Sequence, residues 1–394
     1  MKKRFSVFFI ILSFLMLFVS LTSPTKTKAY AETIKDNVLE ISSKSAFLLD
    51  EKTGKIIYAK NEEERLPIAS MCKIMTLLIC FDNVKEGNLS LDEEILVSEN
   101  ASKMGGSQVF LENNATYKCS ELIKSIIVAS ANDASVAMAE RISGSESAFV
   151  NVMNEKCKEL ELNNTNFTNC TGLPKVGQYS CAKDVATMFR ELIQHEEYFI
   201  FSNIWMDEIK HPNERVTSIS NTNKLIKFYK GCDGGKTGYT SEAGHCLCAT
   251  AKKDGTRLIS VVIKATDSKT RFKDVSNMFN YGFNNFVTKT IFDNNQDIIV
   301  DFKLKNGKIS SPKITVEKPV YYFTEKNSKT SFEYSYQIDK NIKAPATCGT
   351  IIGKITIFVD NIEYDTVNLV LKEDVLEKSY FDNVIDVIVN WNII

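Results

Sequence analysis

A serine and a lysine three positions apart, Ser70 and Lys73, stand at the start of an apolar stretch of the sequence. On a helix, positions i and i+3 share one face, so the lysine amine would lie beside the serine hydroxyl. A serine near a helix N-terminus also lies close to backbone N–H groups that lack partners within the helix and can stabilise an oxyanion. The amine is a general base only when neutral, and burial by Ile74, Leu77 and Leu78 would lower its pKa accordingly. The pattern predicts a serine nucleophile activated by a lysine.

The same residue patterns recur where no catalysis is expected. Ser310-Ser311-Pro312-Lys313 repeats the serine–lysine spacing in a turn-like segment, and Lys52-Thr53-Gly54, in a predicted hairpin turn, repeats the residues of Lys236-Thr237-Gly238. Read singly, a serine such as Ser70 can be a helix N-cap, and a lysine such as Lys73 can be a solvated surface residue. The order of the motifs along the chain is therefore the informative feature.

Three short motifs follow one another: Ser70-x-x-Lys73, Ser130-Ala131-Asn132 and Lys236-Thr237-Gly238. In this order they resemble the penicillin-recognising serine peptidases, and within them the low-molecular-mass penicillin-binding proteins that act as D-alanyl-D-alanine carboxypeptidases. The likeness covers nearly the whole chain beyond its leader. It includes residues 46–50, 53–55, 73–76, 130–139, 166–169, 171–174, 344–346, 349 and 352–353.

The resemblance implies catalytic roles for three residues. Ser70 is the expected acylated nucleophile, Lys73 its general base, and Ser130 the relay that passes a proton between Lys73 and the leaving amine. The implied reaction removes the terminal D-alanine from peptidoglycan stem pentapeptides through an acyl-Ser70 intermediate, with no metal or cofactor. β-Lactams are expected inhibitors, because the lactam mimics the D-alanyl-D-alanine amide and its carboxylate.

The resemblance also implies roles in substrate binding. Asn132 is expected to hydrogen-bond the backbone of the substrate, and Lys236 and Thr237 to hold its terminal carboxylate. Lys236 is further expected to lower the pKa of Lys73 by like-charge repulsion. Arg271 matches a family arginine that assists carboxylate recognition, although on its own it could be a solvated helix residue.

Backbone groups complete the implied site. The N–H groups of Ser70 and Tyr239 are the expected oxyanion hole. Tyr239 stands where a histidine is also seen in the family, a difference that a backbone contact should tolerate. Gly234, Gly235 and Gly238 are expected to let the substrate peptide lie against the edge of a strand.

Strand patterns at both ends of the first two thirds of the chain enclose a helical middle. The expected elements are a hairpin over 45–58, a helix over about 70–84, helices within roughly 119–200, a hairpin over 245–264 and a closing helix over 271–286. Strands from both ends predict a mixed α/β domain whose sheet is completed late, over residues 32–290. The resemblance implies the transpeptidase and β-lactamase-like fold for it.

Short strands separated by turn residues follow and predict a small all-β, sandwich-like domain over residues 291–372. The expected strands cover 298–302, 320–323, 351–358 and 367–371. Residues 373–394 then predict an amphipathic helix. Its apolar face holds Phe381, Val384, Ile385 and Ile388, and its polar face holds Asp382, Asn383, Asp386 and Asn390. Because its net charge is negative, the predicted peripheral contact with a membrane rests on apolar side chains alone. Docking against the β-domain is the alternative.

The N-terminal segment has the pattern of a secretory signal. Residues 2–4 are basic, residues 5–21 are apolar and uncharged, and Ala29-Tyr30-Ala31 has the small residues of a cleavage site. A signal peptide over residues 1–31 is predicted, with an uncleaved anchor as the alternative. The leader carries only basic charges, and the whole chain has 48 basic and 49 acidic residues, so the remainder is mildly acidic. An exported protein at the outer face of the cell membrane or in the cell wall is expected, and a nucleic-acid binder is not.

Three other functions share part of the pattern. A β-lactamase would need a glutamate to activate water, and the segment 159–163 matches that pattern, but it ends a predicted helix. A catalytically inactive wall-binding relative is disfavoured by the intact serines and lysines. A zinc peptidase is disfavoured because His195, His211 and His245 lack ligand spacing. The ten cysteines stand mostly in apolar runs and are predicted to be buried free thiols.

Overall fold

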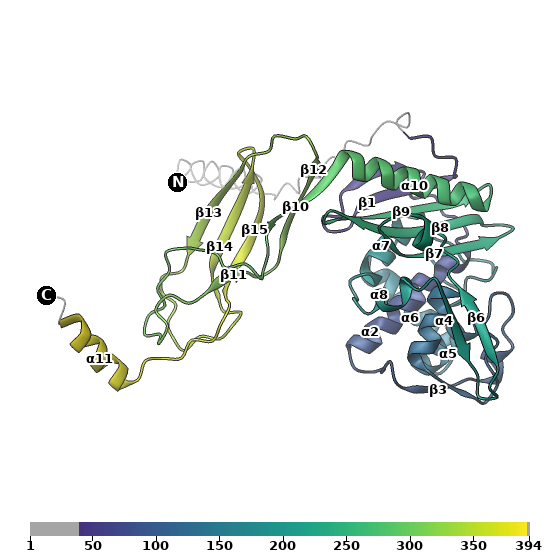
Figure 1. The fold of residues 1–394 in the computed structure, drawn as a ribbon, viewed down its shortest axis with the longest axis horizontal. Coiled ribbons are helices and arrows are strands. Elements are labelled where there is room, and N and C mark those ends of the chain that lie inside the picture. Colours follow the sequence, from purple (N-terminus) through teal and green to yellow (C-terminus); the bar gives the residue numbers. More distant parts are fainter. Residues whose placement is uncertain (1–38, 392–394) are drawn as a thin grey trace, which may run out of the picture. The chain divides into compact units, whose positions relative to one another are not determined.

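The computed structural model describes residues 39–391, and Figure 1 shows their fold. The predicted signal peptide, residues 1–31, lies outside the described residues. Residues 39–285 form an antiparallel sheet with helices on both faces, followed by a second group of strands. This confirms the predicted mixed α/β domain followed by an all-β domain.

The five-stranded sheet has the order β2-β1-β9-β8-β7. Its strands are β1 (Ser45–Asp50), β2 (Ile56–Lys60), β7 (Cys232–Thr240), β8 (Gly244–Lys253) and β9 (Thr256–Ala265). The first hairpin of the chain therefore joins the sheet through β1, which pairs with β9, a strand that comes about 200 residues later. The sequence predicts this late completion of the sheet. Asp254 and Gly255, both with positive φ, form the tight turn between β8 and β9. The strand β7 lies at the edge of the sheet, where one row of its backbone groups is available to a substrate.

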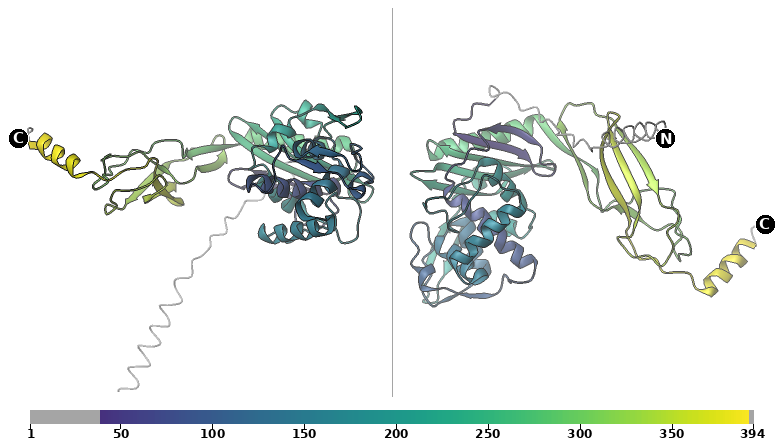
Figure 2. Two further views of the ribbon diagram at one scale, coloured as in Figure 1. Left: turned by 90° about the horizontal axis from the view of Figure 1, so that it is seen from below. Right: turned by 180° about the vertical axis from the view of Figure 1, so that it is seen from behind.

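Alternation along the strands sends side chains into two cores. In β1, Phe47 and Leu49 belong to the larger core, and Ala46 and Leu48 belong to the other one. Figure 1 and the view from behind in Figure 2 show α10 (Ser268–Asn285) on one face of the sheet and α2 (Lys73–Lys85) and α7 (Ala182–Leu192) on the other. The sheet is thus covered on both faces, and only its edge remains open.

The helical layer holds the first two motifs. Its elements are η1 (Ala69–Cys72), α2 (Lys73–Lys85), α3 (Glu99–Ser102), α4 (Cys119–Val128), α5 (Asn132–Ser143), α6 (Glu146–Glu159), α7 (Ala182–Leu192), α8 (Tyr198–Ser202) and α9 (Leu225–Phe228), with the short pairs β3 (Glu94–Leu96) with β4 (Thr116–Lys118) and β5 (Met206–Lys210) with β6 (Val216–Ser220). Every residue of α2 from Lys73 to Phe81 is buried. This buried part of the helix is a rigid support for Lys73.

The C-terminal strands form two further sheets. β10 (Phe286–Phe292) pairs with β12 (Val320–Glu325), and the other sheet has the order β11-β15-β14-β13. Its strands are β11 (Ile314–Val316), β13 (Phe332–Ile338), β14 (Ile351–Val359) and β15 (Ile362–Leu371). The strand expected over 298–302 is wrong. These residues have no ladder partner, and Phe302 is simply packed in the core of this region.

The C-terminal helix, α11, covers Tyr380–Trp391. It starts later than the predicted residue 373, because Val375 forms a bridge with Ala346 and Ser379 caps the helix through reciprocal hydrogen bonds with Asp382. Among the described residues, no helix combines the length and the apolar character that crossing a membrane requires. Nine of the ten cysteines are buried, all ten are free thiols, and only Cys348 is exposed.

Candidate active site

Ser70 lies in the short helix η1, directly before α2. The preceding Ala69 has φ 48°, an unusual conformation for alanine, and the backbone of Gly172 packs against it. A Cβ on Gly172 would lie 2.0 Å from the carbonyl oxygen of Ala69, and one on Gly238 would lie 3.2 Å from the nitrogen of Ser70. Two glycines from distant segments therefore fix the turn that presents Ser70 and keep the space at its N–H open.

Lys73 is fully buried beside Ser70. Its Nζ donates to Ser70 Oγ at 3.2 Å, to Asn132 Oδ1 at 2.6 Å and to the carbonyl oxygen of Thr171 at 2.6 Å. These three acceptors satisfy the three protons of an ammonium group. Burial lowers the pKa of Lys73 to about 8. The neutral base is therefore accessible close to neutral pH, as the sequence predicts.

Ser130 and Asn132 lie at the junction of α4 and α5. Ser130 is buried with φ 61°, a strained conformation that aims its side chain at Lys236, whose Nζ donates to Ser130 Oγ at 2.6 Å. Asn132 accepts from Lys73 through Oδ1 and donates through Nδ2 to the carbonyl oxygen of Gly105 at 2.7 Å. Asn132 thus positions Lys73, and the second proton of its Nδ2 remains for a substrate carbonyl.

The third motif lies on the edge strand β7. Lys236 is 2% exposed and donates to Ser130 Oγ and, at 3.3 Å, to the carbonyl oxygen of Thr237. With two acceptors engaged, its ammonium group can accommodate one more. Among the described residues, the Thr237 hydroxyl has no hydrogen-bond partner. Both groups are placed to receive an anion.

Tyr239 belongs to this strand, and Arg271 reaches the strand from α10. The Tyr239 side chain is 60% exposed and stacks on His245, with ring centroids 4.3 Å apart. Arg271, on α10, donates to the carbonyl oxygens of Gly238 at 3.1 Å and Cys246 at 3.3 Å, and its buried Nε has no partner in the described structure. Arg271 therefore holds the backbone of β7 at the level of Ser70.

The electrostatic coupling differs from the expectation. Lys236 was expected to lower the pKa of Lys73 by repulsion, but burial is the main cause of that shift, and the surrounding thiols and Asp133 oppose it. The repulsion appears instead at Lys236, where burial, Lys73 and Arg271 together hold the pKa well below its usual value. The two lysines and Arg271 form a desolvated cationic group, which strongly favours an incoming carboxylate.

Two of the three strand glycines have a different role from the one expected. A Cβ on Gly234 would lie 2.9 Å from the Tyr198 ring, and one on Gly235 would lie 2.5 Å from the carbonyl oxygen of Cys248. These glycines allow β7 to pack against its own neighbours. Only Gly238 faces η1, where its missing side chain leaves room at Ser70.

The motifs do not reveal every group at the site. The carbonyls of Thr171 and Gly105 hold Lys73 and Asn132, yet a carbonyl exists at every position, so no residue type marks them. Gly172 is the one available signal, because its φ of 83° and its close approach to Ala69 both require glycine.

Comparison with known proteins gives matches over most of the chain. The sequence profile of the peptidase S11 family, described as D-alanyl-D-alanine carboxypeptidase, matches residues 30–267. The profile of the C-terminal domain of penicillin-binding protein 5 matches residues 286–377. The D-alanyl-D-alanine carboxypeptidase DacF of Bacillus subtilis is 40% identical over 339 residues, which cover 86% of this chain and 87% of DacF.

Two further matches belong to the same group of proteins. DacA of Haemophilus influenzae, also a D-alanyl-D-alanine carboxypeptidase, is 32% identical over 88% of each chain. The crystal structure of penicillin-binding protein 5 from the same organism superposes with a TM-score of 0.67 at 30% identity, covering 86% of this chain and 98% of that one. The chain therefore belongs to the peptidase S11 family and is a serine-type D-alanyl-D-alanine carboxypeptidase.

Proposed function

We propose that Ser70 carries out the carboxypeptidase reaction as the acylated nucleophile, with Lys73 as its base. Ser70 Oγ forms an ester with the carbonyl carbon of the penultimate D-alanine, and the bond from that carbon to the nitrogen of the last D-alanine breaks. Water then hydrolyses the ester and restores Ser70. The observation that carries this proposal is the buried Lys73 Nζ, 3.2 Å from Ser70 Oγ, with its pKa lowered to about 8.

Proton transfer to the leaving amine is assigned to Ser130. Its hydroxyl accepts a hydrogen bond from Lys236 at 2.6 Å, and Lys73 Nζ lies 3.2 Å from Ser70 Oγ. The proton taken from Ser70 by Lys73 returns through Ser130 to the departing nitrogen of D-alanine. This route supplies the general acid that an amine leaving group needs.

Lys236 and Thr237 are assigned to the terminal carboxylate of the substrate. The substrate anion would raise the depressed pKa of Lys236 and form a charge-assisted hydrogen bond with it. The N–H groups of Ser70 and Tyr239 are assigned to the oxyanion, and Asn132 Nδ2 to a substrate carbonyl. Arg271 supports this end of the site through the carbonyl of Gly238.

The competing functions find less support. Of the glutamates that match the β-lactamase pattern, Glu159 forms an ion pair with Lys156 at 3.0 Å, and Glu161 lines a separate surface cleft with residues 154–166. Neither forms a contact with Ser70 or Lys73. A catalytically inactive relative would not need the buried, hydrogen-bonded lysines, because burying a charged group is costly.

The test combines a labelled penicillin with a D-alanyl-D-alanine peptide. The wild type is expected to be acylated by the drug and to release D-alanine, whereas Ser70→Ala should do neither. Ser310→Ala, at the exposed copy of the serine–lysine spacing, is the matched control and should behave as the wild type. Penicillin binding by this chain is supported by penicillin-binding relatives, one of which has a crystal structure with ampicillin bound. Labelling retained in Ser70→Ala would contradict the assignment of the nucleophile.

The cellular setting also belongs to this proposal. Residues 1–31 are assigned to a secretory signal, residues 32–290 to the catalytic domain, residues 291–372 to the β-domain and residues 373–394 to a peripheral membrane contact. The last assignment is supported by the exposed side chains of Phe381, which is 75% exposed, and Ile385, which is 57% exposed. Deletion of residues 374–394 should move the protein to the soluble fraction. A truncated protein that stays on the membrane would contradict it.

A further inference from the structure

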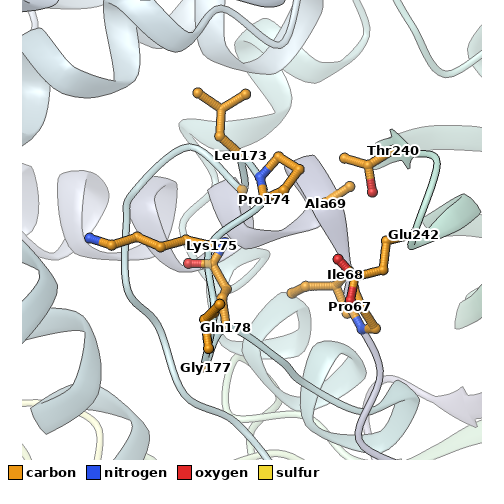
Figure 3. Close-up of a pocket in the computed structure, with 12 residues that line it drawn as sticks. Pro67, Ile68, Ala69, Leu173, Pro174, Lys175, Gly177, Gln178, Thr240 and Glu242 are labelled. Atoms are coloured by element: carbon orange, nitrogen blue, oxygen red, sulfur yellow. The ribbon is translucent and has the colours of Figure 1, made fainter.

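A cavity of about 450 Å³ opens beside the nucleophile, between the end of β7 and the loop over residues 172–178. Ala69, the neighbour of Ser70, forms part of its wall, together with Ile68 and Leu173. Figure 3 shows these residues with Thr240 and Glu242 on the β7 side of the cavity. The cavity therefore adjoins the segment that carries the catalytic serine and the end of the edge strand β7.

The direction of the substrate decides what reaches this cavity. A peptide that lies along the edge of β7 advances by about 3.3 Å per residue. The terminal carboxylate of the peptide is placed at Lys236, and its scissile bond at Ser70, which adjoins Gly238. The acyl part of the peptide must then continue toward Thr240 and the turn that follows. The residue that precedes the terminal D-alanyl-D-alanine then comes level with Thr240, and its side chain can extend into the cavity toward Glu242 in the turn that follows.

Glu242 is the unpaired charge at this position. Of the other polar side chains that line the cavity, Lys175 donates to the carbonyl oxygen of Thr168 at 3.1 Å, and Gln178 accepts from the N–H and the hydroxyl of the same Thr168. Thr240 Oγ1 accepts from the backbone of the following turn. In the described structure the Glu242 carboxylate has no hydrogen bond and no ion pair. Figure 3 shows the amine of Lys175 directed away from Glu242.

We infer that Glu242 is a specificity-determining residue that favours stem peptides in which the residue before the terminal D-alanyl-D-alanine carries a positively charged side-chain amine. The apolar wall formed by Ile68 and Leu173 would accommodate the methylene groups of such a side chain, and the carboxylate would pair with its end. The inference rests on the proposed direction of the substrate along β7. Glu242 acts on binding only and takes no part in the chemical step.

Two substrates that differ only in this charge test the inference: Nα-acetyl-L-Lys-D-Ala-D-Ala and its Nα,Nε-diacetyl form. Because Glu242 is exposed, the wild type should hydrolyse the free-amine peptide with a kcat/KM about two- to five-fold higher, and added salt should reduce this ratio. Glu242→Gln should bring the ratio to about one, and Glu242→Lys should reverse it, since an interaction of this kind is symmetric in sign.

Controls separate this inference from the proposed mechanism. Glu333→Gln, an exposed glutamate on β13, should keep the wild-type ratio, and a labelled penicillin should acylate all variants and so report an intact site. A ratio near one in the wild type, or a ratio unchanged in Glu242→Gln, would overturn the role of Glu242. Release of D-alanine from neither peptide by the wild type would instead contradict the proposed function.

Discussion

The sequence Lys-Thr-Gly occurs twice, in the turn between β1 and β2 and in β7, and the two copies have different environments. In the turn, Thr53 Oγ1 donates to Asp50 at 2.6 Å, and the side chain of Lys52 is 39% exposed. In β7, Lys236 is 2% exposed and bonded to Ser130. The first copy closes a hairpin with its own neighbours. The second copy is buried against residues more than a hundred positions away, which gives the same side chains a chemical role.

The serine–lysine spacing shows the same contrast. Ser310 and Lys313 are both exposed, and the backbone N–H of Lys313 donates to Glu373 Oε1 at 2.9 Å. Lys73 instead has no exposed surface and three acceptors. Desolvation lowers the pKa of a buried lysine, so that it can act as a base, whereas an exposed lysine stays a solvated cation. The residue types of the motif alone do not show which of the two environments applies.

The largest expected loss of carboxypeptidase activity comes from removing the proposed base, Lys73. Lys73→Met keeps the shape of the buried side chain but has no amine, so kcat/KM for D-alanine release should fall by about 10³- to 10⁴-fold. Lys313→Met is the matched control and should retain wild-type activity, because that amine is in solvent. Steady-state kinetics with one D-alanyl-D-alanine peptide measure both. A Lys73→Met enzyme within tenfold of the wild type would remove Lys73 from the mechanism.

The next largest loss of activity is expected from a substitution at the glycine of the Lys-Thr-Gly motif in β7, with the glycine of the other copy as its control. Gly238→Ala would place a Cβ 2.6 Å from the carbonyl oxygen of Ile68 and 3.2 Å from the nitrogen of Ser70, which obstructs the expected oxyanion position. A loss of about 10²- to 10³-fold in kcat is expected, comparable to losing one oxyanion donor. The measurement is kcat at saturating peptide, and a kcat close to that of the wild type would show that this space is not used.

Gly54→Ala is the control for that substitution. Gly54 has φ 69°, and the new methyl group would lie 2.9 Å from the flexible end of Arg190. Thermal unfolding should show a loss of about 1 kcal/mol in the free energy of unfolding, with kcat unchanged. Comparison of Gly54→Ala with Gly238→Ala thus distinguishes a loss of stability caused by turn strain from a loss of activity caused by obstruction of the site.

Regular patterns account for the parts of the fold that the sequence predicts. The continuous apolar runs of β1, β8, β9 and α2 are local signals, and the motif order adds the long-range pairing of the sheet. The strand expected over 298–302 fails because a short apolar run guarantees neither burial nor a ladder partner: Ile299 is 97% exposed, and only Phe302 is buried. β13 was missed although Phe332, Tyr334, Tyr336 and Ile338 alternate with polar residues along it. Its residues 333–337 are exposed, and no continuous apolar run marks the strand in the sequence.

At the site, the sequence supplies side chains but not the backbone that holds them. All nine predicted site residues lie on the segments that surround Ser70, because charged and hydroxyl residues in motifs are recognisable. The acceptors of Lys73 and Asn132 at Thr171 and Gly105 are carbonyls, and the left-handed conformation of Ser130 is imposed by tertiary packing. Such features become visible only when distant segments are placed together.

A smaller loss of activity is expected when the lysine of the Lys-Thr-Gly motif in β7 is replaced, and none when the lysine of the other copy is replaced. Lys236→Met removes a charge-assisted hydrogen bond to the substrate carboxylate, which should raise KM and lower kcat/KM by about ten- to a hundred-fold. Lys52→Met should change neither quantity, because its amine contacts Glu51 and the ring of Tyr321 and none of the site residues. A peptide amidated at its C-terminus is a second probe. If Lys236→Met impaired the amidated and the free peptide to the same degree, the carboxylate would not be its partner.

The smallest expected effect is a dependence of kcat/KM on pH. It shows which of the two buried lysines, Lys73 or Lys236, titrates in the working range of the enzyme. The base must be neutral, so kcat/KM should rise about tenfold per pH unit below the Lys73 pKa of about 8 and level off above it. Lys236→Arg keeps a cation at every pH, and its permanent charge should move this inflection to lower pH by repelling the Lys73 ammonium. The inflection should persist, because it belongs to Lys73. An inflection that disappears in Lys236→Arg would assign the titration to Lys236 instead, and the depressed pKa of Lys236 would then set the working range of the enzyme.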